Sequence, residues 1–176
     1  MKSCFLILTI LLLFSCKKQP APFSQFDKIE YYHTDINQDG ITALFNRKAQ
    51  LSKDDKDFWD IFFKYHQPRS VNDEQVIAVI KRLYKVQGTI DEKYYKAIAD
   101  IFSDHEINDY MIACEPQFRN ILIFKKDNKV TGILKICFGC EKRDFIGSDK
   151  NTVYFGAKGY KKLKNIVTEQ MNTKFH

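Results

Sequence analysis

The alternation of hydrophobic and polar positions divides the first half of the chain into two short strands followed by helices. Alternating apolar residues predict a strand over 26–33. A second apolar run, 41–45, predicts another strand, and the polar segment DINQDG between the two runs is typical of a hairpin loop. Three helical patterns follow, and they begin after Ser52, Asn72 and Asp91, whose side chains are suited to cap a first helical turn.

Strand patterns return in the second half and end in a helix. Runs rich in isoleucine, valine and phenylalanine predict strands at 109–114, 118–125, 129–138 and 152–155. The polar turn KDNK joins the middle two as a hairpin, and residues 157–171 have apolar side chains at helical spacing. We therefore predict one α+β domain over 26–176. It consists of a mainly antiparallel sheet with a C-terminal β-hairpin, three central helices and one C-terminal helix.

The first residues resemble the signal sequence of bacterial lipoproteins. Lys2 precedes an apolar run from Phe5 to Phe14, which is too short to span a membrane, and LFSC ends at Cys16. LFSC resembles the lipobox, which has a leucine three residues before the cysteine that receives lipid. The resemblance implies a signal peptide over 1–15, lipidation of Cys16 and a tether over 16–25. An ordinary secretory signal and an uncleaved anchor are the alternatives.

The residue after the lipobox cysteine bears on location. It is Lys17. In this respect the chain does not resemble the well-studied lipoproteins of the inner membrane, which have aspartate directly after the lipidated cysteine. This favours the outer membrane, facing the periplasm. The net charge of +6 would raise the question of nucleic acid in a cytosolic protein, but outside the cytoplasm we expect no nucleic-acid partner. Lysines stud the final helix, where they suit either anionic lipid or a solvated face, at Lys158, Lys161, Lys162 and Lys164.

Besides Cys16, the predicted mature chain contains three cysteines, Cys114, Cys137 and Cys140. The predicted compartment is oxidising, which favours a disulfide. In the register set by the KDNK turn, Cys114 lies one position away from the residue opposite Cys140. A one-residue bulge near Pro116 would bring the two cysteines directly opposite each other. We therefore predict a Cys114–Cys140 disulfide. Cys137 is then a buried small apolar residue that faces the other side of the sheet.

Two other uses of these cysteines are open. A redox pair of Cys137 and Cys140 would be expected at a helix N-terminus, whereas CFGC closes a predicted strand. A metal site could combine the three cysteines with His105, although zinc sites usually show a second close ligand pair. We expect no cofactor.

Residues 114–140 resemble a motif of small, uncharacterised bacterial lipoproteins, C-x-P-x-F-R-N followed by I-C-F-x-C. The resemblance implies no established activity. It indicates Arg119 and Asn120 as the residues nearest any shared site, and Cys137, the cysteine left without a predicted partner, is a further candidate functional residue. Alternatively, Arg119 pairs with a nearby glutamate and fixes the base of the hairpin.

Other candidate chemistry is sparse. Asp35, Asn37 and Asp39 match the start of an EF-hand calcium loop, but Asn46 stands where the loop requires glutamate, so a polar hairpin loop is the alternative. The histidines are scattered, and neither a nucleophile elbow nor a phosphate loop is present in the sequence. We therefore predict a non-enzymatic module that binds a protein or envelope component, such as an immunity-type protein. A thiol-redox or metal-binding periplasmic protein is the alternative.

Overall fold

The computed structural model describes residues 26–103, 113–147 and 155–174. The elements are β1 (Lys28–His33), α2 (Gln38–Asn46), η2 (Lys48–Gln50), α3 (Lys53–Phe63), α4 (Glu74–Leu83), β2 (Val86–Thr89), η3 (Glu92–Tyr94), α5 (Tyr95–Phe102), β3 (Asn120–Lys126), β4 (Lys129–Cys137), β5 (Lys142–Gly147) and α6 (Ala157–Lys174). The predicted α+β class and the C-terminal helix are confirmed. The predicted signal peptide and tether, His105 and most of the predicted strands 109–114 and 152–155 lie outside the described residues.

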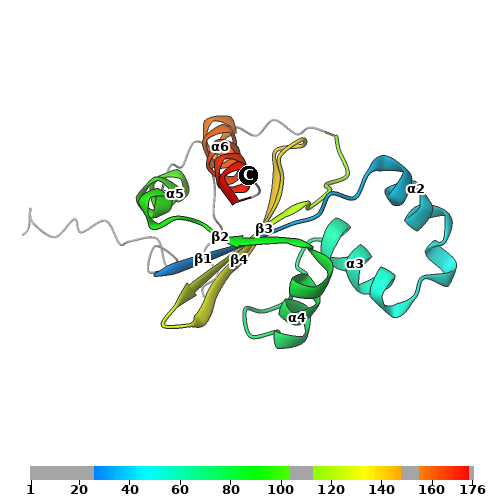
Figure 1. Ribbon diagram of the computed structural model, residues 1–176. Coiled ribbons are helices and arrows are strands. Elements are labelled where there is room, and N and C mark those ends of the chain that lie inside the picture. The colour runs from blue at the N-terminus through cyan, green and yellow to red at the C-terminus, as the bar shows by residue number, and fades with distance from the viewer. Residues whose placement is uncertain (1–25, 104–112, 148–154, 175–176) are drawn as a thin grey trace, which may run out of the picture.

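The described strands form one antiparallel sheet of five strands in the order β2-β1-β3-β4-β5. Helices α5 and α6 lie on one face of the sheet, and α3 and α4 lie on the other (Figure 1). Neighbouring residues of β3 divide between the two faces, as the pleat requires. Leu122 packs in the core under α5 and α6, and Ile123 packs in the core against α4. The domain therefore has a three-layer arrangement with a hydrophobic core on each side of the sheet.

The β3–β4 hairpin forms at the predicted turn. Lys126 pairs with Lys129, and Asp127 and Asn128 between them have φ angles of 49° and 61°. Asp and Asn tolerate this left-handed conformation, which the tight turns of hairpins need. A bulge between Phe124 and Lys125 then shifts the register of the rest of the hairpin.

The predicted strand at 41–45 is wrong, because this run lies inside helix α2. The Asn37 side chain accepts a hydrogen bond from the Gly40 N–H at 2.9 Å and caps the helix. Ile41 and Leu44 are buried three residues apart, which is a helical spacing rather than a strand one. The polar segment DINQDG therefore leads into the N-terminus of α2 and does not form the predicted hairpin loop.

The other differences concern short edge strands and caps. Strands β2 and β5 were not predicted; each lies at an edge of the sheet, and only pairing with a neighbour makes it extended. Ser52 caps α3 as predicted, whereas α4 is capped by Asp73 rather than by Asn72. Asp91 caps the short η3, which leads directly into α5.

Candidate functional site

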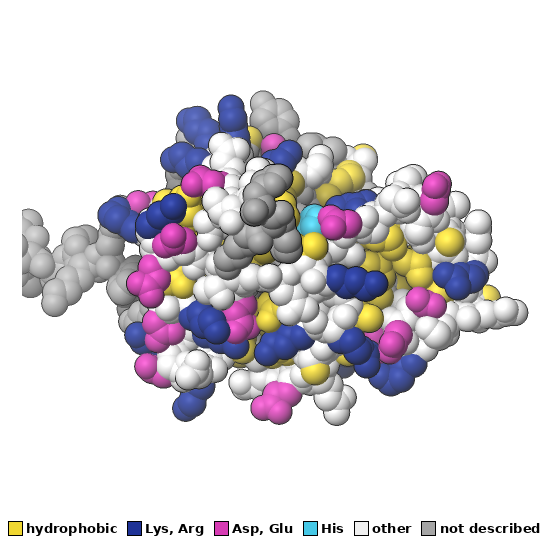
Figure 2. Space-filling model, in the orientation of Figure 1, with side chains coloured by type: hydrophobic (Ala, Val, Ile, Leu, Met, Phe, Trp, Pro, Cys, Tyr) yellow, Lys and Arg dark blue, Asp and Glu magenta, His cyan; other side chains and the backbone are white. Residues whose placement is uncertain are grey.

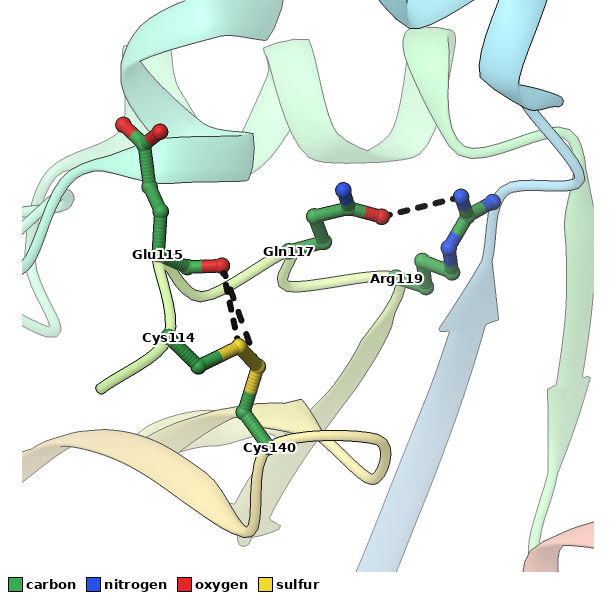
Figure 3. Close-up of a disulfide and its surroundings, with 5 residues drawn as sticks. All are labelled: Cys114, Glu115, Gln117, Arg119 and Cys140. Atoms are coloured by element: carbon green, nitrogen blue, oxygen red, sulfur yellow. Dashed lines mark hydrogen bonds between the residues drawn. A yellow bond between two sulfur atoms is a disulfide. The ribbon is translucent and has the colours of Figure 1, made fainter. Parts of the chain in front are cut away.

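The predicted Cys114–Cys140 disulfide is present at one end of the β3–β4 hairpin (Figure 3). The two Cα atoms are 6.1 Å apart, within the usual range for disulfides. The backbone carbonyl of Glu115 points towards both sulfur atoms. The disulfide ties the segment that precedes β3 to the turn that follows β4.

The backbone brings the two cysteines together in a different way from the predicted one. The bulge lies at Phe124 and Lys125, close to the turn, and not near Pro116. Residues 113–119 are irregular, and Cys140 lies in the turn beyond the end of β4. The disulfide therefore joins two loops, not two directly opposed strand residues.

Cys137 is a free, buried cysteine that packs with Phe118 and Cys140. The expectation that it faces away from the disulfide is wrong. Cys140 does not continue the pleat of β4, because the chain turns after Cys137 and brings Cys140 back to the same side. The free thiol and the disulfide are thus neighbours in one small apolar cluster.

A hollow of about 350 Å³ lies beside the disulfide. Its walls come from the segments 114–120 and 137–140, and Arg119, Asn120 and Cys137 all contribute to them. The residues that the sequence indicated therefore meet at one end of the sheet. Their side chains, however, are engaged in different contacts.

The Arg119 guanidinium holds neighbouring chain segments together. It donates one hydrogen bond to the Ile36 carbonyl and another to the Gln117 side-chain oxygen at 3.0 Å. It also lies 5.7 Å from the centre of the Phe62 ring. In Figure 3 the guanidinium points away from the disulfide. These contacts tie the loop after β1 to the start of β3, in place of the predicted glutamate pairing.

Asn120 belongs to the opposite face of the sheet. Its Oδ1 accepts a hydrogen bond from the Tyr31 hydroxyl at 3.0 Å and lies 2.9 Å from His33 Nδ1. The other ring nitrogen of His33 lies 2.7 Å from Asp35 Oδ1. Burial, with a smaller contribution from the charge of Asp35, raises the pKa of Tyr31. The sequence held no signal for this group, because 87 residues separate His33 from Asn120.

A buried ion pair lies two residues before Cys137 on β4. Lys135 Nζ is 3.1 Å from Asp144 Oδ2, and the two side chains are 0% and 2% exposed. The same Nζ donates hydrogen bonds to the carbonyls of Ile61 and Lys64 at the end of α3. Burial lowers the pKa of Lys135 to about 8, although the charge of Asp144 opposes this shift. The sequence placed Lys135 in an apolar strand but did not indicate its partner.

Asp144 completes this group by accepting a hydrogen bond from the His66 backbone N–H at 2.8 Å. The Lys135–Asp144 pair therefore supplies donors to two helix-end carbonyls and an acceptor to the following loop. Each of these backbone groups needs a partner once it is shielded from water. The arrangement holds α3 against the hairpin.

The calcium candidates are engaged in local structure. Asp35 contacts His33, Asn37 caps α2, and Asp39 lies in the first turn of that helix. Among the residues that the structure describes, no three His, Cys, Asp or Glu side chains are grouped to hold a metal ion. Cys114 and Cys140 are oxidised to a disulfide in this structure, so they do not offer thiolate ligands here.

Comparisons with protein-family models, with curated proteins and with solved structures found no match to this chain. No helix in the described part of the chain is long and apolar enough to cross a membrane.

Proposed function

We propose that this chain is a lipid-anchored, non-enzymatic binding module of the bacterial cell envelope. Cys16 carries the lipid and holds the domain at the outer membrane, on the periplasmic side. The lipobox-like LFSC supports the anchor. The Cys114–Cys140 disulfide supports an oxidising compartment.

The binding role is argued from an aromatic surface on the lobe formed by α2, η2 and α3, in which Phe45 is the exposed ring and Trp59 and Phe63 are the buried rings beneath it. Phe45 is 39% exposed, and its ring makes T-shaped contacts with Trp59 at 4.5 Å and Phe63 at 5.3 Å. Lys48 lies over the Trp59 ring at 5.0 Å. Hydrophobic side chains are visible in the surface of this region, at the right of Figure 2. A rigid aromatic anchor with a cation beside it is a common feature of protein interfaces.

The polar residues near the disulfide support binding over catalysis. The Arg119, Asn120 and Lys135 side chains each bond to another part of the fold, and these bonds connect loops, helix ends and strands. Groups used in this way stabilise the domain. We therefore propose that a protein partner binds the aromatic surface. In one specific case, this chain is an immunity-type protein and the partner is the toxin that it blocks. The absence of a toxin-like gene beside this one would count against that case.

Site-specific crosslinking tests the binding role. A photo-reactive residue replaces Phe45 in the lipidated protein, and the envelope is irradiated before the protein is recovered. A second protein carries the same residue at Lys85, which is exposed in the short segment between α4 and β2. We expect a discrete protein adduct from position 45 and none from position 85. Equal, diffuse labelling from both positions would overturn the proposal.

A thiol function is the second candidate, and the packing of free Cys137 against Cys140 favours it. Thiol counting on the denatured mature protein separates the cases. A structural disulfide with an unused Cys137 predicts one free thiol without reductant and three with it. Three free thiols without reductant, together with bound zinc or copper, would support the metal alternative. A small thiol found attached to Cys137 would support redox chemistry.

A further inference from the structure

The first half of α6 presents an exposed surface of lysines. This lysine face consists of Lys158, Lys161, Lys162 and Lys164, all exposed. The other side of the helix is buried in the core against the sheet, through Tyr160, Leu163, Ile166 and Val167. Basic side chains gather over α6 at the top of Figure 2. The lysine face therefore points outward from the layer that α5 and α6 form.

These lysines do not stabilise the helix that carries them. Lys158 and Lys162 are four residues apart, and Lys161 and Lys164 are three apart, so like charges are neighbours on the helix surface. Helices α2, α3 and α4 have acidic residues in their first turn, whereas α6 has none. Lys161, Lys162 and Lys164 form no ion pair with another described residue. The charge is thus available to an external anion.

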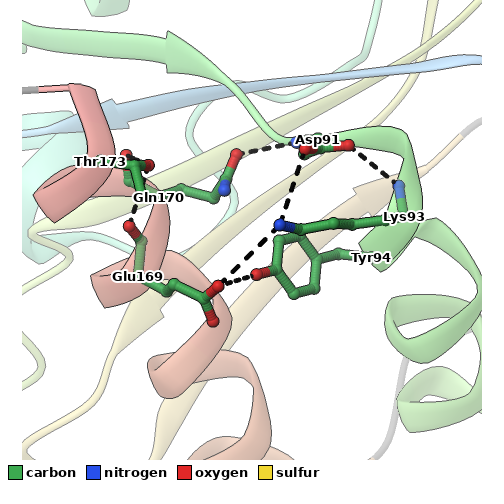
Figure 4. Close-up of polar contacts among 6 residues, drawn as sticks. All are labelled: Asp91, Lys93, Tyr94, Glu169, Gln170 and Thr173. Carbon is green, nitrogen blue, oxygen red and sulfur yellow. Dashed lines mark hydrogen bonds and ion pairs between the residues drawn. The ribbon is translucent and has the colours of Figure 1, made fainter.

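The second half of α6 is occupied by contacts within the domain (Figure 4). The carboxylate of Glu169 accepts a hydrogen bond from the Tyr94 hydroxyl and lies 4.0 Å from Lys93 Nζ. The Gln170 side chain accepts a hydrogen bond from the Asp91 backbone N–H at 2.8 Å. The acidic residue of α6 is therefore held at the end of the helix away from the lysine face.

The chain enters the fold on the same side as α6. The ring of Phe26 packs on Tyr95 of α5 at 5.3 Å and on Phe124 at 5.2 Å. The ten steps from Cys16 to Phe26 reach at most about 36 Å, and α6 is about 27 Å long. A lipid on Cys16 thus allows α6 to lie on the membrane that holds it.

We propose that the lysine face of α6 lies on this membrane and binds its anionic phospholipid headgroups. The inference depends on the proposed lipid anchor. The anchor keeps the face close to the surface, and a lipid combined with a polybasic patch attaches more firmly than either alone.

Lysine footprinting tests this placement. The lipidated protein is incorporated into vesicles of phosphatidylcholine with or without phosphatidylglycerol, lysines are acetylated, and each site is quantified by mass spectrometry. We expect Lys161, Lys162 and Lys164 to react about fivefold more slowly on anionic vesicles. This factor equals the gain in affinity that one lysine contributes at an anionic membrane surface. High salt should remove the difference. Equal rates on both vesicles would overturn the proposal.

A charge-matched pair of variants shows whether the lysines themselves hold the helix. In K161Q/K162Q/K164Q, Lys158 should lose its protection on anionic vesicles. In the control variant, exposed lysines of α3, of α4 and of the segment that follows α4 are replaced, as K56Q/K81Q/K85Q, and the protection of Lys158 should persist. Loss in both variants would refute the assignment to this face.

The experiment distinguishes an error in the proposed lipid anchor from an error in the proposed placement of α6. Mass measurement of the same sample shows whether Cys16 carries lipid. Without lipid, the proposed function and this inference both fail. With lipid present and equal acetylation rates, only the placement of α6 fails.

Discussion

The buried Lys135–Asp144 pair allows a sharp test of how this fold is held together. The two charges are 3.1 Å apart and almost fully shielded from water. In Lys135→Met, the Asp144 carboxylate keeps the His66 N–H but loses its counter-charge, and the Ile61 carbonyl loses a donor. Removing one partner of a buried ion pair costs about 3–5 kcal/mol. We expect this loss in the free energy of unfolding.

A double-mutant cycle isolates the coupling between the two residues. Asp144→Leu leaves the Lys135 ammonium without a counter-charge, so it should destabilise the fold by a similar amount. The double variant K135M/D144L buries two apolar side chains instead. We expect its loss to be smaller than the sum of the two single losses by about 2–3 kcal/mol.

A surface pair of similar geometry is the control. Arg82 and Asp54 are 2.8 Å apart, but their side chains are 52% and 56% exposed. Their cycle should yield a coupling below about 1 kcal/mol. Urea unfolding followed by the fluorescence of the single tryptophan, Trp59, measures all of these variants with the disulfide intact. Additivity of the Lys135 and Asp144 losses within about 0.5 kcal/mol would refute the reasoning.

The same pair makes stability depend on pH. Burial lowers the pKa of Lys135 from 10.5 to about 8 in the folded state. Between these values the unfolded chain binds more protons than the folded one, so the contribution of Lys135 to stability rises with pH. The slope is at most about 1.4 kcal/mol per pH unit. Urea midpoints should rise in the native protein relative to Lys135→Met over this window, and parallel curves would contradict the expectation.

Three further predictions concern the Cys114–Cys140 disulfide and the packing of α4 and α6. The double variant C114S/C140S should lose about 3 kcal/mol, because the disulfide closes a sequence separation of 26 residues, and an unchanged melting temperature would contradict this. Tyr84→Phe should lose about 1–2 kcal/mol in urea unfolding, because the buried hydroxyl donates to the Phe118 carbonyl at 2.8 Å; a loss under about 0.5 kcal/mol would argue against that bond. Gly159→Ala should destabilise by about 1 kcal/mol or more despite the better helix propensity of alanine, because its Cβ would lie 2.8 Å from a neighbouring side-chain carbon, and a more stable variant would show that α6 can shift.

Local sequence patterns determined the parts of the fold that depend on nearby residues. The Ser52 cap, the hairpin turn at 127–128 and the apolar spacing of α6 are each readable within a few residues, and all three agree with the structure. The run 41–45 does not distinguish the two conformations, because a short apolar segment fits a strand or a helix equally well. The Asn37 side chain caps the first turn and so favours the helix over the strand.

The short edge strands and the partners of polar residues depended on tertiary structure. Strand β5 is extended because it pairs with β4, and its own composition does not impose that conformation. The pairing of the cysteines was predictable, because the expected oxidising compartment and the hairpin register together left few options. The disulfide, however, joins two loops and not two opposed strand residues. Arg119 and Asn120 are adjacent in sequence yet bond on opposite faces of the sheet, as the pleat dictates.

The sequence by itself determined the apolar framework, the disulfide pairing and the proposed anchor. Only the tertiary structure decided that Lys135 meets Asp144 and that the chain enters the fold on the side of α6. The physical reason is distance along the chain. Hydrophobic periodicity and capping act between neighbouring residues, whereas the partner of a buried charge is chosen by how the sheet and helices pack.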